Sequence, residues 1–333
     1  MTTPVQYIAT WFYKESAQDA SFYPQTGKRG DSSLVHSIYM QIQVPFFTTF
    51  RHYNPEAKLL FFTNVEVLPD YLNHLFATLD VEVTRLPYRC IPPDGWYNAW
   101  RNQFYVYDIW QYMGPRMQNE DNLLICDADC LCTTSLDPLF NEVTTNGSAL
   151  YELTTAPEIL TNGITLAQMT NLYEACYGQK ASRPIYYYGG EFFALRGDIV
   201  KKVNKAYQEL WAYNLSLFKD NLPKLNEEAL FFSVLAEHLN IRNNIANKYI
   251  KRMWTSPQYN NVTKADEKLA IWHLPYEKKR GLYRLFKLLA HTPTIENEAL
   301  FWQKAALYTG IPTVSFRKKL ADWEIAILRK LKS

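Results

Sequence analysis

Short apolar runs alternate with segments of helical spacing along the first half of the chain. Four runs rich in β-branched and aromatic residues are typical of buried strands, at 5–13, 58–65, 81–88 and 123–133. The segments between them have helical spacing, at 32–53, 68–79 and 96–113, and Pro45 is expected to interrupt the first. Strands separated by helices of this length pair in parallel, because parallel neighbours need a crossover connection. The pattern therefore predicts an α/β sheet.

The second half of the chain has a more mixed pattern. A strand that contains a Gly-Gly pair is expected at 186–198, and helices are expected at 199–215 and 225–239. From Gly281 onward the spacing is helical, and the last segment places its large apolar residues on one stripe. These residues are Phe316, Leu320, Trp323, Ile327 and Leu331. We therefore expect an α/β domain over 1–280 and a helical extension over 281–333.

The composition is that of a globular protein. Of 333 residues, 47% are hydrophobic and 20% charged, with only 12 Gly and 17 Pro, which excludes disorder and fibrous repeats. The N-terminal stretch "MTTPVQYIATWF" lacks the features of a signal peptide, and no apolar segment approaches the ~20 residues that span a bilayer. The 5 cysteines favour reduced thiols over a disulfide framework. We expect a cytoplasmic protein.

The net charge of +2 hides an asymmetry along the chain. Residues 276–333 contain 12 Lys and Arg against 5 Asp and Glu, whereas the rest of the chain contains 23 against 28. A basic C-terminal end can face phosphates, an anionic membrane surface or nucleic acid, and it can also consist of solvated helix faces. The charge alone leaves these alternatives open.

Two aspartates interrupt the apolar stretch "LLICDADCLCT". In an extended strand Asp127 and Asp129 point to one face, and Cys126, Cys130 and Cys132 point to the other. Buried carboxylates without partners cost several kcal/mol, so the pair must reach water or bind a cation. A hard ion such as Mn²⁺ or Mg²⁺, shared with substrate phosphates, satisfies this requirement. The alternative is a solvent-facing strand end.

The three cysteines of this stretch are also candidate ligands of a structural zinc ion. A structural zinc site pairs Cys-x2-Cys sets or adds a histidine at fixed spacing, and this pattern is absent from the stretch. Small thiols packed behind the strand are the better interpretation.

An apolar strand that ends in Asp-x-Asp, after an alternating α/β half, resembles the nucleotide-sugar-dependent glycosyltransferases of the GT-A fold. The stretch "LLICDADCL" is most similar to the corresponding motif of glycosyltransferase family 8 and its relatives. That family also has a histidine that binds the metal, followed six residues later by a lysine that contacts the diphosphate. In "AIWHLPYEKKRG", His273 and Lys279 have this spacing. The resemblance covers about residues 1–280.

The match around the histidine is incomplete. The family has Gly three residues after the histidine and Pro-Trp after the lysine, where this chain has Tyr276 and then Arg280 and Gly281. Lys278, Lys279 and Arg280 are therefore alternative candidates for the phosphate contact.

The resemblance implies a mixed GT-A-type, Rossmann-like sheet flanked by helices, and a set of site residues. Its implied metal ligands are Asp127, Asp129 and His273, with Mn²⁺ or Mg²⁺ as the cofactor. Its implied donor-binding residues are Tyr13, Arg101, Asp108, Asp127, Gly189, Gly190 and Lys279. Packing remains an alternative for Tyr13, and a surface position remains one for Arg101.

Glu227 and Glu228 are the implied catalytic residues, because they resemble the acidic helix start beside the donor sugar. In an inverting enzyme one of them is the general base, and in a retaining enzyme it orients or stabilises the reacting sugar. The alternative is structural: Asn226 is a good N-cap, and acidic residues in a first helical turn complement the helix dipole.

The function implied is that of a hexosyltransferase-like, metal-dependent enzyme that transfers a sugar from a UDP-linked donor to an acceptor hydroxyl, with retention. Bacterial polysaccharide or glycoconjugate synthesis would fit, with a glycan or lipid-linked acceptor, membrane contact through the basic tail at the inner face, and no obligate protein partner. One alternative is a nucleotidyltransferase, which needs a Gly-rich basic loop near the N-terminus, where "IATWFYKES" is a poor match. Another is a nucleic-acid or membrane-binding protein built around the tail.

Overall fold

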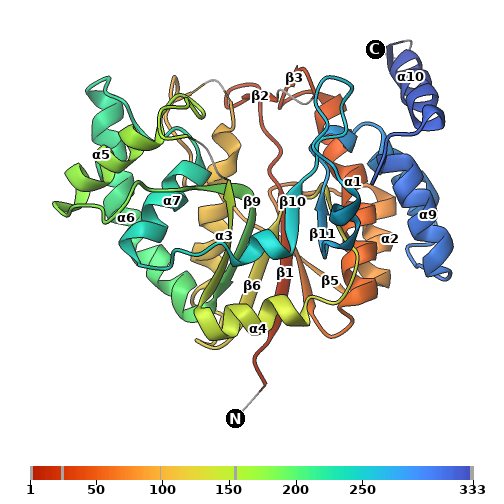
Figure 1. Cartoon of the computed structure of the whole chain (residues 1–333), viewed down its shortest axis with the longest axis horizontal. Coiled ribbons are helices and arrows are strands. Elements are labelled where there is room, and N and C mark those ends of the chain that lie inside the picture. Colours follow the sequence, from red (N-terminus) through yellow and green to blue (C-terminus); the bar gives the residue numbers. More distant parts are fainter. Residues whose placement is uncertain (1–2, 24–25, 98, 154–155, 331–333) are drawn as a thin grey trace.

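A mixed six-stranded sheet forms the centre of the molecule, with helices on both faces (Figure 1). The computed structural model describes residues 3–23, 26–97, 99–153 and 156–330. The strands in spatial order are β5 (Val81–Arg85), β4 (Lys58–Thr63), β1 (Gln6–Phe12), β6 (Asn122–Cys126), β9 (Tyr187–Arg196) and β8 (Ser148–Leu153). Only β9 runs antiparallel to its neighbours β6 and β8, while the pairs β5–β4, β4–β1 and β1–β6 are parallel. The predicted α/β class is confirmed.

Two apolar layers hold the helices against this sheet. One layer contains buried residues of α1 (Ser33–Tyr53), α2 (Asp70–Thr78), α4 (Asp137–Asn146) and α8 (Gly281–Leu289). The other contains residues of α3 (Tyr105–Met113), α5 (Leu166–Tyr177), α6 (Gly197–Lys219) and α7 (Glu228–His238). Because successive strand residues face opposite layers, Ile8 packs in the first and Ala9 in the second. The central strands β1, β4 and β6 are thus buried on both faces, which explains their nearly continuous apolar runs, whereas the edge strand β5 is partly exposed.

Pro45 does not end the first helix, and the expected interruption is wrong. Helix α1 runs through it from Ser33 to Tyr53. A proline inside a helix costs about 3 kcal/mol. Phe46, Phe47 and Phe50, which follow it, are fully buried, and burial of each contributes roughly 1.5–3 kcal/mol. Packing of the helix on the sheet therefore outweighs the lost backbone hydrogen bond.

The aromatic helix expected from residue 96 begins later than predicted. A short 3₁₀ turn spans Arg101–Phe104, and α3 starts only at Tyr105. Trp96 instead donates its indole N–H to the carbonyl of Asn226 at 3.1 Å, and Trp100 has a left-handed backbone with φ of 60°. The left-handed backbone of Trp100 is incompatible with an α-helix that runs on from residue 96, and Trp96 makes a tertiary contact instead.

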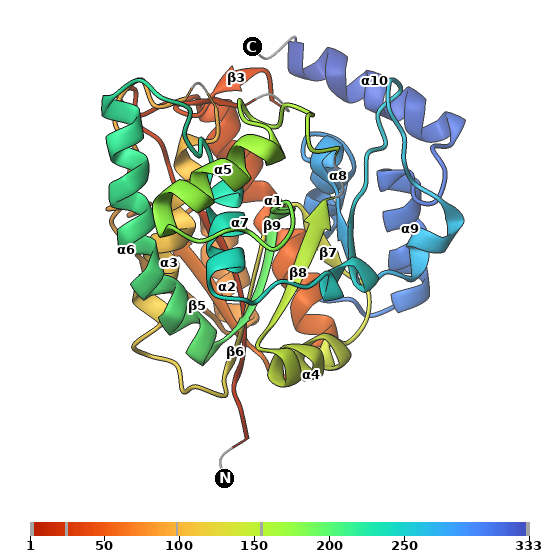
Figure 2. The same ribbon diagram turned by 60° about the vertical axis from the view of Figure 1, so that its left-hand side comes forward.

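The C-terminal segment is helical, as expected. It consists of α8, α9 (Glu298–Thr309) and α10 (Phe316–Lys330), which gather at one side of the molecule (Figure 2). Helix α8 lies against α1, so this segment begins within the core. No helix in the described part of the chain is both long and apolar enough to cross a membrane. The division into domains at residue 280 stays a prediction.

Candidate metal site and cleft

The Asp-x-Asp stretch is a strand followed by a turn, not one continuous strand, so the expected single extended conformation is wrong. Strand β6 ends at Cys126, and the N–H of Cys130 donates to the carbonyl of Asp127 at 3.2 Å across the turn. The chain then enters β7 (Cys130–Cys132), which belongs to a second sheet in the order β10 (Ile250–Arg252), β11 (Ile271–His273), β7. All three cysteines are buried in the apolar layers, as expected.

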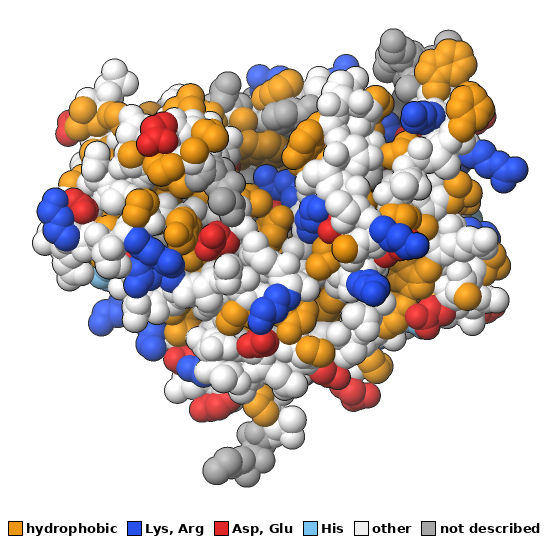
Figure 3. Space-filling view, in the orientation of Figure 1, with side chains coloured by type: hydrophobic (Ala, Val, Ile, Leu, Met, Phe, Trp, Pro, Cys, Tyr) orange, Lys and Arg blue, Asp and Glu red, His pale blue; other side chains and the backbone are white. Residues whose placement is uncertain are grey.

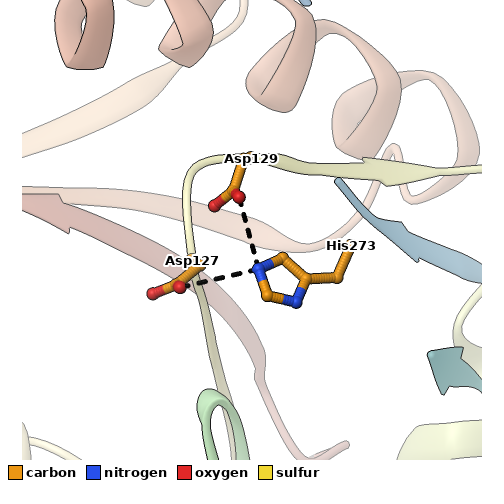
Figure 4. Close-up of side chains that lie close together, drawn as sticks. All are labelled: Asp127, Asp129 and His273. Carbon is orange, nitrogen blue, oxygen red and sulfur yellow. Dashed lines mark ion pairs between the residues drawn. The ribbon is translucent and has the colours of Figure 1, made fainter. Parts of the chain in front are cut away.

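Pairing of β7 with β11 brings His273 to the two aspartates. The strands are antiparallel, His273 lies opposite Cys130, and the N–H of Leu274 donates to the carbonyl of Asp129 at 3.0 Å. The three side chains converge, as Figure 4 shows. His273 Nε2 lies 3.3 Å from Asp129 Oδ2 and 3.7 Å from Asp127 Oδ2. The structure therefore assembles the three residues that were predicted as metal ligands.

The chemistry of this cluster fits a divalent cation. One ligand atom from each of Asp127, Asp129 and His273 lies within 4.8 Å of the others. Carboxylate oxygen and imidazole nitrogen bind such ions at about 2.0–2.2 Å, so an ion between these atoms can reach all three. Among the described residues, Asp129 Oδ1 and His273 Nε2 are buried without a hydrogen-bond partner. Bound metal would satisfy both atoms.

Charges in the cluster shift its protonation. Burial and the charge of Asp129 raise the pKa of Asp127 to about 6. Burial alone would raise the pKa of Asp129, but the charges of Lys278 and His273 hold it below its usual range. Burial lowers the pKa of His273, but the charge of Asp129 outweighs it and raises this pKa to about 9. Near neutral pH, His273 thus holds a proton that a metal must displace.

Binding of Mn²⁺ is expected to tighten as the pH rises. Below about pH 9, loss of one proton from His273 makes the affinity increase about tenfold per pH unit, and Asp127 adds to this slope only near and below pH 6. Titration with Mn²⁺ between about pH 6.5 and 8 measures the slope. In His273→Gln the slope should flatten, because glutamine does not titrate. An equal affinity of the native protein at both ends of this range would contradict the assignment.

A cleft of about 560 Å³ opens beside the cluster. Asp127, His273 and Lys278 are part of its wall, and so are Gly190, Glu227 and Glu228. Strand β9 supplies the glycine, and the start of α7 supplies the acidic pair. The cleft therefore joins the predicted metal ligands to the predicted catalytic residues. Ligands bind beyond the carboxyl ends of strands in sheets of this kind, and Asp127 directly follows such an end.

The acidic pair at the start of α7 is buried. Glu227 accepts a hydrogen bond from the Tyr187 hydroxyl at 2.7 Å, whereas Glu228 Oε2 has no partner among the described residues. Burial and the charge of Glu227 raise the pKa of Glu228 well above its usual range. A side chain at Gly190 would meet Glu228 Oε1, since a Cβ there would lie 2.0 Å from it. The glycine leaves room for the acid in the cleft wall.

Asn226 is not the N-cap of this helix, contrary to the structural alternative. Helix α7 begins at Glu228, with Glu227 at the cap position and no capping side-chain hydrogen bond. The side chain of Asn226 instead donates to the carbonyl of Asn162 at 2.9 Å and accepts from Lys224 at 2.7 Å. These tertiary contacts displace the helix start by one residue.

Two charged residues of the cleft wall, Glu191 and Arg252, were not predicted from the sequence. Glu191 is buried and accepts two hydrogen bonds from Arg252, at 2.6 Å and 2.5 Å, and its Oε1 lies 3.4 Å from His273 Nδ1. A carboxylate behind a ligating histidine fixes the ring so that the other nitrogen faces the metal. Glu191 follows the Gly-Gly pair directly, which was a usable signal. Nothing in the sequence around Arg252 marks it.

The two adjacent lysines point to different places. Lys278 lines the cleft, and its Nζ donates to Asp129 Oδ2. Lys279 Nζ donates to the carbonyl of Thr26 at 3.1 Å. The guanidinium group of Arg280 lies 4.0 Å from the centre of the Tyr276 ring. Of the three candidates for a phosphate contact, Lys278 is therefore the one that contacts the cluster of Asp127, Asp129 and His273.

The remaining predicted donor-binding residues lie beside the cleft or away from it. Tyr13 packs on Tyr88 and Tyr105, while its neighbour Phe12 lines the cleft. Arg101 donates to the carbonyl of Pro92 at 2.9 Å.

Asp108 borders a second cavity, of about 270 Å³, and accepts hydrogen bonds from the backbone N–H groups of Arg89 and Cys90. Gly189 is adjacent to the cleft residue Gly190 and leaves room for Glu191.

Comparison with known proteins yields structural neighbours only. No protein-family model and no curated protein matches this chain. Mouse xyloside xylosyltransferase 1 aligns at 13% identity with a TM-score of 0.46, over 81% of this chain and 97% of that chain.

Two further neighbours are longer than this chain. Glycosyltransferase GlyE of Streptococcus pneumoniae TIGR4 aligns at 11% identity with a TM-score of 0.43, over 90% of this chain and 62% of that chain. The bifunctional glycosyltransferase WbbM aligns at 10% identity with a TM-score of 0.49, over 91% of this chain and 52% of that chain. The chain is thus similar in structure to proteins that are named as glycosyltransferases.

Proposed function

We propose that this protein is a metal-dependent glycosyltransferase of the GT-A type that uses a UDP-linked sugar as donor and Mn²⁺ or Mg²⁺ as cofactor. The observation that carries the proposal is the cluster of Asp127, Asp129 and His273 at the wall of a cleft beyond a strand end. Two carboxylates and an imidazole suit a hard ion that shares its remaining positions with a diphosphate. The mixed sheet, with β9 as its single antiparallel strand, supports the same assignment.

The bound ion would act as a Lewis acid that neutralises the departing diphosphate. Lys278 adds a second positive charge at the cluster, and the carboxylate of Glu191 lies 3.4 Å from His273 Nδ1, the ring nitrogen that does not face the two aspartates. The carboxyl of Glu228 lies next to the space left by Gly190, where it can form a hydrogen bond with a hydroxyl of the donor sugar. Gly190 and the acidic pair thus form the sugar end of the cleft.

We favour transfer with retention, because the Asp-x-Asp stretch is most similar to family 8. The bond between the anomeric carbon and the diphosphate breaks, and its electron pair leaves with the diphosphate. The acceptor hydroxyl oxygen bonds to the same face of the sugar, and its proton passes to a diphosphate oxygen. Glu227 and Glu228 then orient the sugar rather than act as the base. A glycan or lipid-linked acceptor in polysaccharide or glycoconjugate synthesis suits this chemistry.

Removal of the metal is expected to abolish donor turnover. Without the ion, the negative charge on the leaving diphosphate is not neutralised, so hydrolysis of UDP-sugars should fall at least about a hundredfold with EDTA. Release of UDP across a panel of UDP-sugars, with EDTA and then with excess Mn²⁺, measures the loss and its recovery. Activity that persists in EDTA, or no turnover and no Mn²⁺-dependent binding of any donor, would refute the proposal.

We also propose that α10 contacts a membrane surface. Its apolar stripe is exposed, with Phe316 at 73%, Trp323 at 68% and Leu320 at 52% of their full surfaces. Figure 3 shows hydrophobic and basic side chains side by side over this helix, and the described basic residues there include Arg317 and Lys319. A helix with apolar and basic groups together binds the interface of anionic bilayers. Leu331, predicted on the same stripe, lies outside the described residues.

Vesicle binding tests this contact. We expect the protein to bind phosphatidylglycerol vesicles, and Trp323→Ser to weaken binding about tenfold or more, because a buried aromatic side chain contributes roughly 1.5–3 kcal/mol. Leu300→Ser, an exposed position on α9, is the matched control. Equal binding by Trp323→Ser and the native protein in co-sedimentation would argue against the contact.

A further inference from the structure

Lys278 holds a position that is unusual for a lysine. Only 5% of its surface is exposed, and its ammonium group pairs with Asp129, of which 1% is exposed. The Tyr39 ring, 5.7 Å from Nζ, is a further contact of the charge. A buried lysine keeps its charge only beside such a partner, because desolvation of an unpaired ammonium costs several kcal/mol. Lys278 and Asp129 therefore depend on each other in this state of the site.

The same carboxylate oxygen faces both Lys278 and the histidine. Asp129 Oδ2 accepts from Lys278 Nζ and lies 3.3 Å from His273 Nε2, the nitrogen that faces the cluster. A divalent ion held by Asp129 and His273 would lie within a few ångströms of the ammonium group. Two cations at that separation repel each other strongly in a buried site. The paired lysine thus opposes binding of the metal.

The surroundings allow the side chain of Lys278 to move while its backbone stays fixed. The preceding residue, Glu277, accepts hydrogen bonds from Gly281 N–H at 3.0 Å and from the hydroxyl of Thr255, and it pairs with Lys318 at 2.9 Å. The side chain of Lys278 borders the open cleft and has a flexible four-carbon stem. A diphosphate in the cleft offers the ammonium group another anionic partner.

We propose that Lys278 is an internal counter-ion, which pairs with Asp129 in the resting site and transfers to the donor diphosphate when the metal binds. The transfer moves the positive charge of Lys278 away from the metal ion and towards the leaving diphosphate. As a result, the site binds metal together with diphosphate more tightly than it binds metal alone. The site therefore resists loading with free metal and accepts the metal with a nucleoside diphosphate. This inference rests on the proposed function.

Binding of Mn²⁺ with and without UDP tests the exchange. Free Mn²⁺ is followed by electron paramagnetic resonance, with a correction for Mn²⁺ bound by UDP in solution. In Lys278→Met, Mn²⁺ alone should bind at least about fivefold more tightly than in the native protein, and the tightening by UDP should be smaller. Lys278→Arg keeps the charge and should bind Mn²⁺ alone as weakly as the native protein does. Lys287→Met, at an exposed position on α8, is the matched control.

Thermal unfolding gives a second readout that also reports whether the variant folds. Lys278→Met leaves Asp129 buried without its partner, so Mn²⁺ should raise the unfolding temperature more in this variant than in the native protein. Unchanged or weaker binding of Mn²⁺ alone by Lys278→Met would overturn the exchange and leave the proposed function intact. Failure of the native protein to bind Mn²⁺ even with UDP would overturn the proposed function itself.

Discussion

Asp129→Asn is expected to lower metal-dependent sugar transfer by about a hundred- to a thousandfold. The substitution keeps the shape of the side chain and removes its charge. Asp129 is the most enclosed member of the cluster, with 1% of its side chain exposed against 29% for Asp127. Its loss removes a metal ligand that water does not readily replace. Initial rates of UDP release with saturating Mn²⁺ measure the loss of activity. The loss should be smaller in Asp127→Asn than in Asp129→Asn.

The same substitution leaves the ammonium group of Lys278 buried without a counter-ion. Breaking a buried pair in this way costs about 3–5 kcal/mol of stability, so loss of folding must be separated from loss of chemistry. The double variant Asp129→Asn with Lys278→Met removes both charges. We expect it to recover most of the stability in urea unfolding and none of the activity. Full activity in the stable double variant would show that Asp129 is not required for catalysis.

Hydrophobic pattern predicted the central strands well because they are buried on both faces, and it also predicted the partly exposed edge strand β5. The runs at 5–13, 58–65 and 81–88 correspond to β1, β4 and β5. The same pattern concealed the turn after Cys126, because the residues of β7 are as apolar as those of β6 and both are buried. Periodicity cannot distinguish one long strand from two short strands in different sheets.

The site was predicted only where local sequence carries its chemistry. Asp127, Asp129 and His273 were found through motifs, and the structure brings them together through pairing of β7 with β11. Glu191 of β9 accepts a hydrogen bond from Arg252 of β10, and no local sequence pattern predicts this contact between the two strands.

The late start of α3 is a second feature that the local sequence pattern does not predict. A continuous helix from residue 96 was expected, and contacts of Trp96 with distant residues displaced its start to Tyr105. Arg101 consequently lies in the short turn before α3, where it binds the carbonyl of Pro92.

A buried ion pair joins the C-terminal helix α10 to the segment around Glu277, which directly precedes Lys278. Lys318 of α10 is fully buried, and its Nζ lies 2.9 Å from Glu277 Oε1 and 2.5 Å from Asp322 Oδ2. Lys278 is the lysine that contacts the cluster of Asp127, Asp129 and His273. Arg284 of α8 donates to Asp322 at 3.0 Å, which extends the network to the helix that packs on α1. The basic tail therefore includes at least one cation with a structural partner rather than a solvated charge.

Lys318→Met is expected to lower the free energy of unfolding by about 3–5 kcal/mol, because it leaves Glu277 buried without its cation. Urea unfolding followed by tryptophan fluorescence measures the change. Lys319→Met is the matched control, since the neighbouring lysine is exposed and such surface substitutions change stability by only about 0.5 kcal/mol.

A double variant tests whether the unpaired charge of Glu277 causes this loss of stability. The double variant Glu277→Gln with Lys318→Met has no unpaired buried charge, so it should be more stable than Lys318→Met alone. Glutamine at residue 277 can accept the hydrogen bond from Gly281 N–H with its amide oxygen, and its amide N–H group can donate to the Thr255 hydroxyl, so both partners keep a hydrogen bond. If Lys318→Met is no less stable than Lys319→Met, the ion pair between Lys318 and Glu277 does not anchor α10. The placement of this helix against the segment around Glu277 would then be wrong.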